Sequence, residues 1–182
     1  MSPRAFALAL ALLLAPPMAV AQQEVRATEV GIKAAFLYKF CAFVEWPAGV
    51  LPAPDAPFTI GVLGADAVAE ELTRVVARRT VNGRAVQVRK LPRGAPLGAL
   101  QVLFIGGQDA SRLAEQLASA RGRPLLVVTE TRDGPAQGSM INFVLVDDKV
   151  RFDVALPSAE AGKLKISSRL LAVARKVLGA PS

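Results

Sequence analysis

Apolar positions between residues 32 and 44 repeat every three or four residues, which is the spacing of a helix face. These positions are Ile32, Phe36, Leu37, Phe40, Cys41, Phe43 and Val44. The face is wider than an ordinary amphipathic stripe, so the helix has to be covered on most sides. Because the residue before a proline is disfavoured in the α region, Pro47 predicts that the helix ends between residues 44 and 46.

Short apolar runs then alternate with amphipathic segments. Residues 47–57 contain four prolines and predict a surface loop. Strands are predicted at 58–63, 85–90, 102–105 and 125–129, with an Asn82-Gly83 turn before the second. One helix is predicted at 66–79, capped by Asp66. Another is predicted from the cap Asp109 through about residue 120, and Gly122 ends it. This order implies parallel strands, right-handed crossovers and helices on both sheet faces.

The pattern changes after residue 140. Two apolar runs at 141–146 and 150–156 flank Asp147-Asp148-Lys149, which predicts an antiparallel hairpin at one edge of the sheet. A helical turn at 158–163 and a helix at 167–178 close the chain. The predicted fold is therefore a single α/β domain with a mainly parallel sheet, helices on both faces and an antiparallel edge hairpin.

Residues 1–21 are typical of a secretory signal peptide. Arg4 precedes an apolar run at 5–15, and Ala19-Val20-Ala21 forms a cleavage site before Gln22. The run is shorter than a membrane span, and two prolines interrupt it. We expect residues 22–182 to form one periplasmic domain that does not span the membrane after cleavage.

Charge and composition exclude several functions. The chain has 22 Lys and Arg against 15 Asp and Glu, which favours an anionic lipid, a nucleotide or an acidic protein face. Its basic residues are scattered and lack interleaved aromatics, so we expect no nucleic-acid binding. There is no histidine, and Cys41 is the only cysteine, so the usual general bases and metal ligand sets are missing. We predict no catalytic residues, no metal, no cofactor and no enzymatic activity, with Cys41 packed in the core.

One glycine-rich turn offers a weaker hypothesis. Gly106-Gly107 precedes a predicted helix and could direct backbone N–H groups at an anion. Strand-to-helix turns also need glycine for geometry alone, and we prefer that interpretation.

Five motifs occur in register along the chain. They are K-A-A-F-L-Y-K-F-x-x-F-V-E-W-P at 33–47, F-T-I-G-V-L-G at 58–64, V-N-G-R at 81–84, V-L-F-I at 102–105 and G-x-L-K-I-S-S-R-L-L at 162–171. In the order and spacing of these motifs, the sequence resembles the YfiR family. The resemblance implies a periplasmic repressor that occupies the periplasmic domain of an inner-membrane diguanylate cyclase, and we also expect a homodimer. Some relatives carry cysteine pairs, whereas this chain has only Cys41, so redox control is not expected here.

The candidate binding residues lie in two of these motifs. They are Glu45, Trp46, Lys165, Ser168 and Arg169. Ser167 can cap the last helix, but a cation at Arg169 opposes the helix dipole unless an acid such as Glu45 pairs with it. Trp46 is an amphipathic anchor of the type found in recognition sites, although packing under the proline loop is an equal alternative.

Two other functions stay open at this stage. A periplasmic small-molecule binding protein would hold an anion near Gly106, Gly107 and Arg169, at the carboxyl ends of the strands. The second alternative function is that of a hydrolase or transferase that works without histidine.

Overall fold

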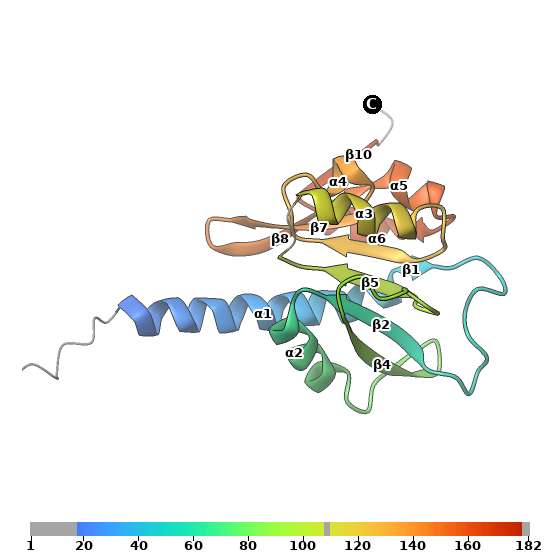
Figure 1. The fold of residues 1–182 in the computed structure, drawn as a ribbon, viewed down its shortest axis with the longest axis horizontal. Helices are drawn as coiled ribbons and strands as arrows, with labels where there is room; N and C mark the ends of the chain where they lie inside the picture. The colour runs from blue at the N-terminus through green and yellow to red at the C-terminus, as the bar shows by residue number, and fades with distance from the viewer. Residues whose placement is uncertain (1–17, 108–109, 180–182) are drawn as a thin grey trace, which may run out of the picture.

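The aromatic-rich segment forms the second half of α1 (Met18–Ala42), the longest helix of the molecule. The computed structural model describes residues 18–107 and 110–179. Phe36 and Phe40 of α1 pack on Phe143 and Phe152, and the Phe40 and Phe152 rings meet edge-to-face with centroids 5.0 Å apart. The wide apolar face predicted for this helix is therefore covered, although only its second half lies against the sheet, and the first half projects beyond it (Figure 1).

A mostly parallel eight-stranded sheet confirms the predicted fold class. Its order is β10-β8-β7-β6-β5-β2-β4-β3. The strands are β2 (Phe58–Leu63), β3 (Thr80–Val81), β4 (Arg84–Leu91), β5 (Val102–Ile105), β6 (Leu126–Thr129), β7 (Ile141–Val146), β8 (Lys149–Ala155) and β10 (Lys176–Leu178). Neighbouring strands from β4 to β7 are parallel, and β7 pairs antiparallel with β8.

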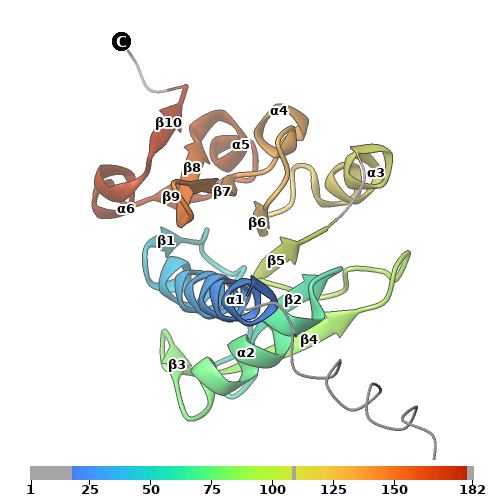
Figure 2. The same ribbon diagram turned by 90° about the vertical axis from the view of Figure 1, so that its left-hand side faces the viewer.

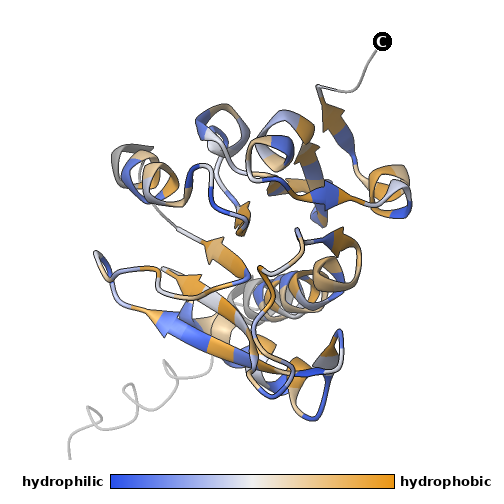
Figure 3. Cartoon of the chain, turned by 90° about the vertical axis from the view of Figure 1, so that its right-hand side faces the viewer, coloured by the Kyte–Doolittle hydropathy of each residue, from blue (hydrophilic) through white to orange (hydrophobic). Residues whose placement is uncertain are grey.

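Helices cover both faces of the sheet. On β5, Val102 and Phe104 face the cluster formed with α1 and α2 (Asp66–Val76), whereas Leu103 and Ile105 face α3 (Ala110–Ala120). Figure 2 shows the sheet curled about α1, with β2 and β4 to its right and lower right and β7 and β8 above. Hydrophobic residues dominate the central strands in Figure 3, while β4 alternates between half-buried and exposed positions along most of its length.

Several predicted boundaries need correction. The first helix ends at Ala42, because Val44–Glu45 leaves it to form β1, paired with β9 (Lys165–Ile166). The 66–79 helix ends at Val76, and Ala65 rather than Asp66 is its N-cap, without a side-chain cap. The helical turn predicted at 158–163 is α5 (Leu156–Ala161).

The predicted helix at 167–178 was wrong in its second half. Ser167 does cap α6 (Ser168–Val173) by accepting a hydrogen bond from Leu170 N–H at 3.3 Å. The chain then leaves the helix, and β10 pairs parallel with β8, so the hairpin is not the outermost element of the sheet. A short apolar run suits a helix or a strand, and here the free edge of β8 selects the strand.

The glycine and asparagine turns behave as predicted. Asn82 and Gly83 both have positive φ and link β3 to β4. Strand β3 has two residues and was not predicted from the sequence. Gly122 ends α3 with φ of +71°. Asp109 and residues 1–17 of the predicted signal peptide lie outside the described residues, and residues 18–21 are the first of α1.

Candidate functional site

A cleft of about 670 Å³ opens at the carboxyl ends of β5 and β6. One wall is α1, with Glu29 and Lys33, and the opposite wall is the β7–β8 hairpin with residues 142–145. The segment after β6, a helical turn α4 (Gly134–Gln137) and Arg175 complete it. Parallel α/β sheets place their ligand sites at this edge.

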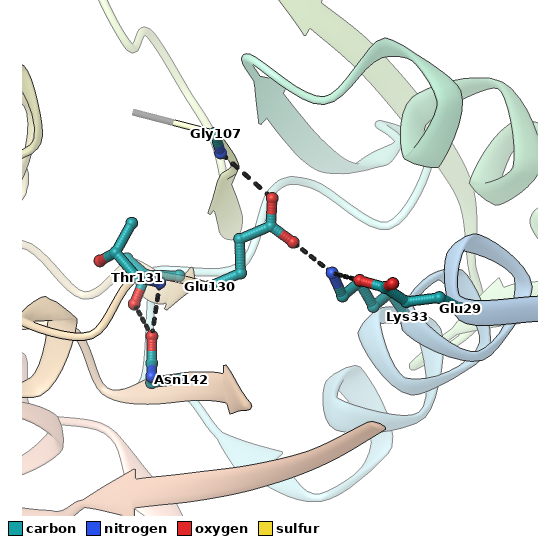
Figure 4. A network of polar contacts seen from close by, with 7 residues as sticks. Glu29, Lys33, Gly107, Glu130, Thr131 and Asn142 are labelled. Atoms are coloured by element: carbon teal, nitrogen blue, oxygen red, sulfur yellow. Dashed lines mark hydrogen bonds and ion pairs between the residues drawn. The ribbon is translucent and has the colours of Figure 1, made fainter. Parts of the chain in front are cut away.

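A buried lysine organises the inner end of the cleft (Figure 4). Lys33 is only 8% exposed, and its Nζ donates hydrogen bonds to Glu29 and, at 2.5 Å, to Glu130. Burial acts to lower the pKa of Lys33, but the hydrogen bonds and charges of Glu130 and Glu29 outweigh it and raise the pKa above its ordinary value. Lys33 is therefore charged at physiological pH and tied to two carboxylates.

Glu130 also fills the backbone position that the glycine turn offers. The Gly107 N–H donates to Glu130 Oε1 at 3.1 Å. A Cβ at Gly106 would lie 2.6 Å from Glu130 Oε1 and 2.7 Å from the Ala65 Cβ, so glycine is needed for this approach. The turn therefore binds a carboxylate of the same chain through Gly107, and the close approach requires glycine at Gly106.

Asn142 is a buried amide held in one orientation at the base of the hairpin wall. It is 2% exposed, and its Oδ1 accepts hydrogen bonds from Thr129 Oγ1 at 2.6 Å and Thr131 N at 3.1 Å. Because Thr131 N–H is a donor, the oxygen must face it, and the Nδ2 group faces the other way. Asn142 is one of the residues that line the cleft.

A second ion pair joins the last strand to the cleft. Arg175 donates through Nε to Asp153 Oδ1 at 2.8 Å and through Nη2 to Asp153 Oδ2. This bidentate hydrogen bond, opposed by partial desolvation, raises the pKa of Arg175. Arg132 is exposed and makes no ion pair in the part of the chain that the structure describes.

The predicted binding residues gather at a different place, the β1–β9 ladder. Glu45 lies directly across from Lys165, and Ser167 N–H donates to the Phe43 carbonyl at 2.9 Å. Ser168 and Arg169 follow in the exposed first turn of α6. The register thus places Lys165, not Arg169, opposite Glu45, and none of the five residues lines the cleft.

Trp46 follows the alternative interpretation in part. Its ring meets Phe58 edge-to-face with centroids 5.3 Å apart, and its Nε1 is buried without a hydrogen-bond partner among the described residues. The side chain is nevertheless half-buried rather than enclosed.

The prediction missed the cleft residues, although a signal existed. Glu29 and Lys33 have the i,i+4 spacing of a helix ion pair, and Lys33 interrupts the apolar face next to Leu37. Glu130 follows a fully buried strand, where a carboxylate at the sheet edge is informative. The bond between Lys33 and Glu130 spans 97 positions, and no local pattern predicts it.

Cys41 is buried as predicted, and its thiol donates to the Leu37 carbonyl at 3.2 Å. Among the described residues, no group of three or more cysteine, aspartate or glutamate side chains is placed to hold a metal ion. No helix in residues 18–107 or 110–179 has the length and apolar character needed to cross a membrane.

Comparisons with known proteins agree with this description. A family model described as YfiR/HmsC-like matches residues 31–175. The crystal structure of a conserved domain protein from Vibrio cholerae aligns with a TM-score of 0.56 at 12% identity, over 81% of this chain and 60% of that chain. An ABC domain in complex with L-Trp from Streptococcus pneumonia aligns with a TM-score of 0.48 at 10% identity, over 66% and 55%. No curated protein gives a significant match. The Vibrio structure shows a likeness of fold, and the chain spans 60% of the length of that protein.

Proposed function

The chain belongs to the YfiR/HmsC-like family, and from this we propose that it binds the periplasmic domain of an inner-membrane diguanylate cyclase and represses cyclic di-GMP synthesis. The family comprises periplasmic, non-catalytic regulators of diguanylate cyclase signalling. The observation that carries the proposal is the extent of the match, residues 31–175, which includes the β1–β9 ladder and nearly all of the cleft.

The geometry of the cleft favours this function over an anion-binding protein. Where a parallel sheet usually holds its ligand, Glu130 occupies both the Gly107 N–H and the Lys33 ammonium. Arg169, the third residue expected at an anion site, does not line this cleft. An anion bound at the glycine turn would have to displace the Glu130 carboxylate from two partners.

We assign the partner surface to the predicted residues Glu45, Trp46, Lys165, Ser168 and Arg169. Support comes from their proximity across the β1–β9 ladder and from their neighbour on α6. Val173 lies one turn after Arg169 on the same helix face and is 66% exposed. Arginine is enriched among the residues that anchor protein interfaces.

The test is calorimetric titration with the purified periplasmic domain of the membrane diguanylate cyclase encoded nearest to this gene. Arg169→Glu should weaken binding by about 2 kcal/mol, roughly thirtyfold, as expected for an arginine anchor. Trp46→Ala should do the same, with some loss of stability because the ring packs on Phe58.

The matched control is Arg121→Glu, which reverses an exposed arginine that follows α3 on the other face of the sheet. Equal binding by wild type and Arg169→Glu would remove this surface from the proposal. Absence of binding by the wild-type chain would refute the function. Sedimentation of the purified chain tests the expected homodimer separately.

A further inference from the structure

Strand β7 extends beyond its parallel neighbour β6. Its partner β8 pairs with all six of its residues, from Ile141 to Val146. On the other side, β6 pairs only with Ile141 and Asn142. The rest of β7 therefore has one edge facing the cleft, and Phe143, Val144 and Leu145 line it. Figure 1 shows this hairpin projecting in the same direction as the first half of α1.

The turn of the hairpin fixes which backbone groups face that edge. Asp147 and Asp148 have φ of 48° and 56°, which makes a two-residue turn closed by hydrogen bonds between Val146 and Lys149. In an antiparallel pair the hydrogen-bonded residues alternate, so the N–H and C=O of Leu145 point away from β8. No described residue pairs with them.

The side chains along this edge are also unusual for an unpartnered strand. Leu145 is 56% exposed, and Val146 beside it is exposed as well. Apolar strand edges are normally covered or blocked, because they pair readily with another chain. Here the charged residues stand only at the tip, Asp147 and Asp148, beyond the apolar positions.

The charges of the cleft indicate which kind of chain it suits. Lys33 already has two carboxylates and Arg175 has Asp153, whereas Arg132 at the rim makes no ion pair within the described residues. Residues 22–182 have 21 Lys and Arg against 15 Asp and Glu, a formal charge of +6, so an acidic segment is favoured over a basic one.

We propose that the cleft takes an extended, acidic-and-apolar segment of the partner protein, which adds to the sheet as a strand beside β7 and continues the line of β6. Its backbone bonds with Leu145, an apolar side chain packs on Leu145, and an acidic side chain reaches Arg132. Main-chain pairing of this kind is a recurrent mode of peptide recognition. The inference rests on the proposed function, because the added strand belongs to the proposed partner and is a contact beyond the surface at the β1–β9 ladder.

Amide hydrogen exchange of the isotopically labelled chain, with and without the purified periplasmic domain, tests the proposal at a single residue. The Leu145 amide should exchange rapidly in the free chain. In the complex its exchange should be slower by roughly tenfold or more, since pairing protects it. This measurement needs no variant and no assumption about folding.

Two substitutions at Leu145 then separate backbone from side chain. Leu145→Pro removes an N–H that β8 does not use and should weaken binding roughly tenfold or more, whereas Leu145→Thr keeps the N–H and should weaken it less. Circular dichroism of both variants confirms that the hairpin is retained.

The outcomes are distinguishable. Binding without protection of Leu145 overturns the strand addition and leaves the regulator function intact. Failure of the wild-type chain to bind the domain overturns the function itself. Protection of Leu145 that rises with the concentration of the chain alone assigns the edge to a second copy and also overturns the proposal.

Discussion

The Lys33–Glu130 bond is the contact that most directly couples α1 to the carboxyl edge of the sheet. We expect it to be worth more than an ordinary surface ion pair. The perturbation is a double-mutant cycle of Lys33→Met, Glu130→Gln and the double variant, which isolates the pairwise term from the separate effects of each change.

The structure sets the magnitude. Hydrogen bonds to charged groups contribute about 1.5–3 kcal/mol, and loss of one partner from a fully buried pair costs about 3–5 kcal/mol. The Lys33 side chain is mostly buried, but that of Glu130 is 21% exposed and Glu29 still holds the lysine after Glu130 is neutralised. We therefore expect a coupling of about 1–2 kcal/mol, reduced from the buried limit by solvent screening.

Urea unfolding followed by circular dichroism measures the cycle. The matched control is the exposed Lys90–Glu70 pair, bonded at 2.8 Å, for which the coupling should be indistinguishable from zero. A coupling near zero for Lys33 and Glu130 would refute the role given to this contact.

The pH dependence gives a second check on the same pair. The folded-state pKa of Lys33 is raised above its ordinary value of 10.5, so the stabilisation is fully present below that pH and is lost as pH rises through the folded pKa. The difference in free energy of unfolding between wild type and Lys33→Met should be constant between about pH 7 and 9 and shrink only above about 10.5. A decline already at pH 8 would contradict this.

Three further predictions concern packing and the C-terminal edge. Gly134→Ala should lower the free energy of unfolding by about 1–3 kcal/mol, because a Cβ would lie 2.8 Å from Asn142 Oδ1; thermal unfolding measures it. Cys41, whose pKa burial raises to about 12, should resist alkylation at pH 8 until urea unfolds the chain, and Cys41→Ala should leave repression the same in oxidising and reducing buffer. Asp153→Asn should loosen β10, seen as faster amide exchange in Lys176–Leu178 with little change in β5; unchanged exchange would mean that backbone pairing alone holds this strand.

The sequence predicted those elements whose signal is local. Strands β2, β5 and β6 are short, fully buried and mainly apolar, and the β7–β8 hairpin has a turn signal between two mainly apolar runs. Each carries its information within a few residues, and each was found within one or two positions.

The elements that were missed depend on partners far along the chain. The β1–β9 ladder is two residues long, and β10 is a strand only because β8 offers an edge. Nothing within the segment 176–178 distinguishes it from the end of a helix, so its conformation is decided by tertiary pairing.

The candidate site divides in the same way. Glu45 was predicted to pair with Arg169, whereas the strand register places Lys165 opposite Glu45. The alternative site near Gly107 lies in the cleft, but the bond that joins Lys33 on α1 to Glu130 after β6 was not predicted. The Glu29 and Lys33 spacing and the position of Glu130 after β6 were its local indications.

The central claim is that this protein represses a membrane diguanylate cyclase from the periplasm, and the cellular level of cyclic di-GMP tests it most directly. The cyclase encoded nearest to this gene is expressed alone, with the wild-type chain, or with Arg169→Glu, and periplasmic amounts of the chain are matched. The account predicts a lower level of cyclic di-GMP with the wild-type chain and recovery toward the cyclase-alone level with Arg169→Glu. A level that is unchanged by the wild-type chain, with the chain present in the periplasm, would contradict it.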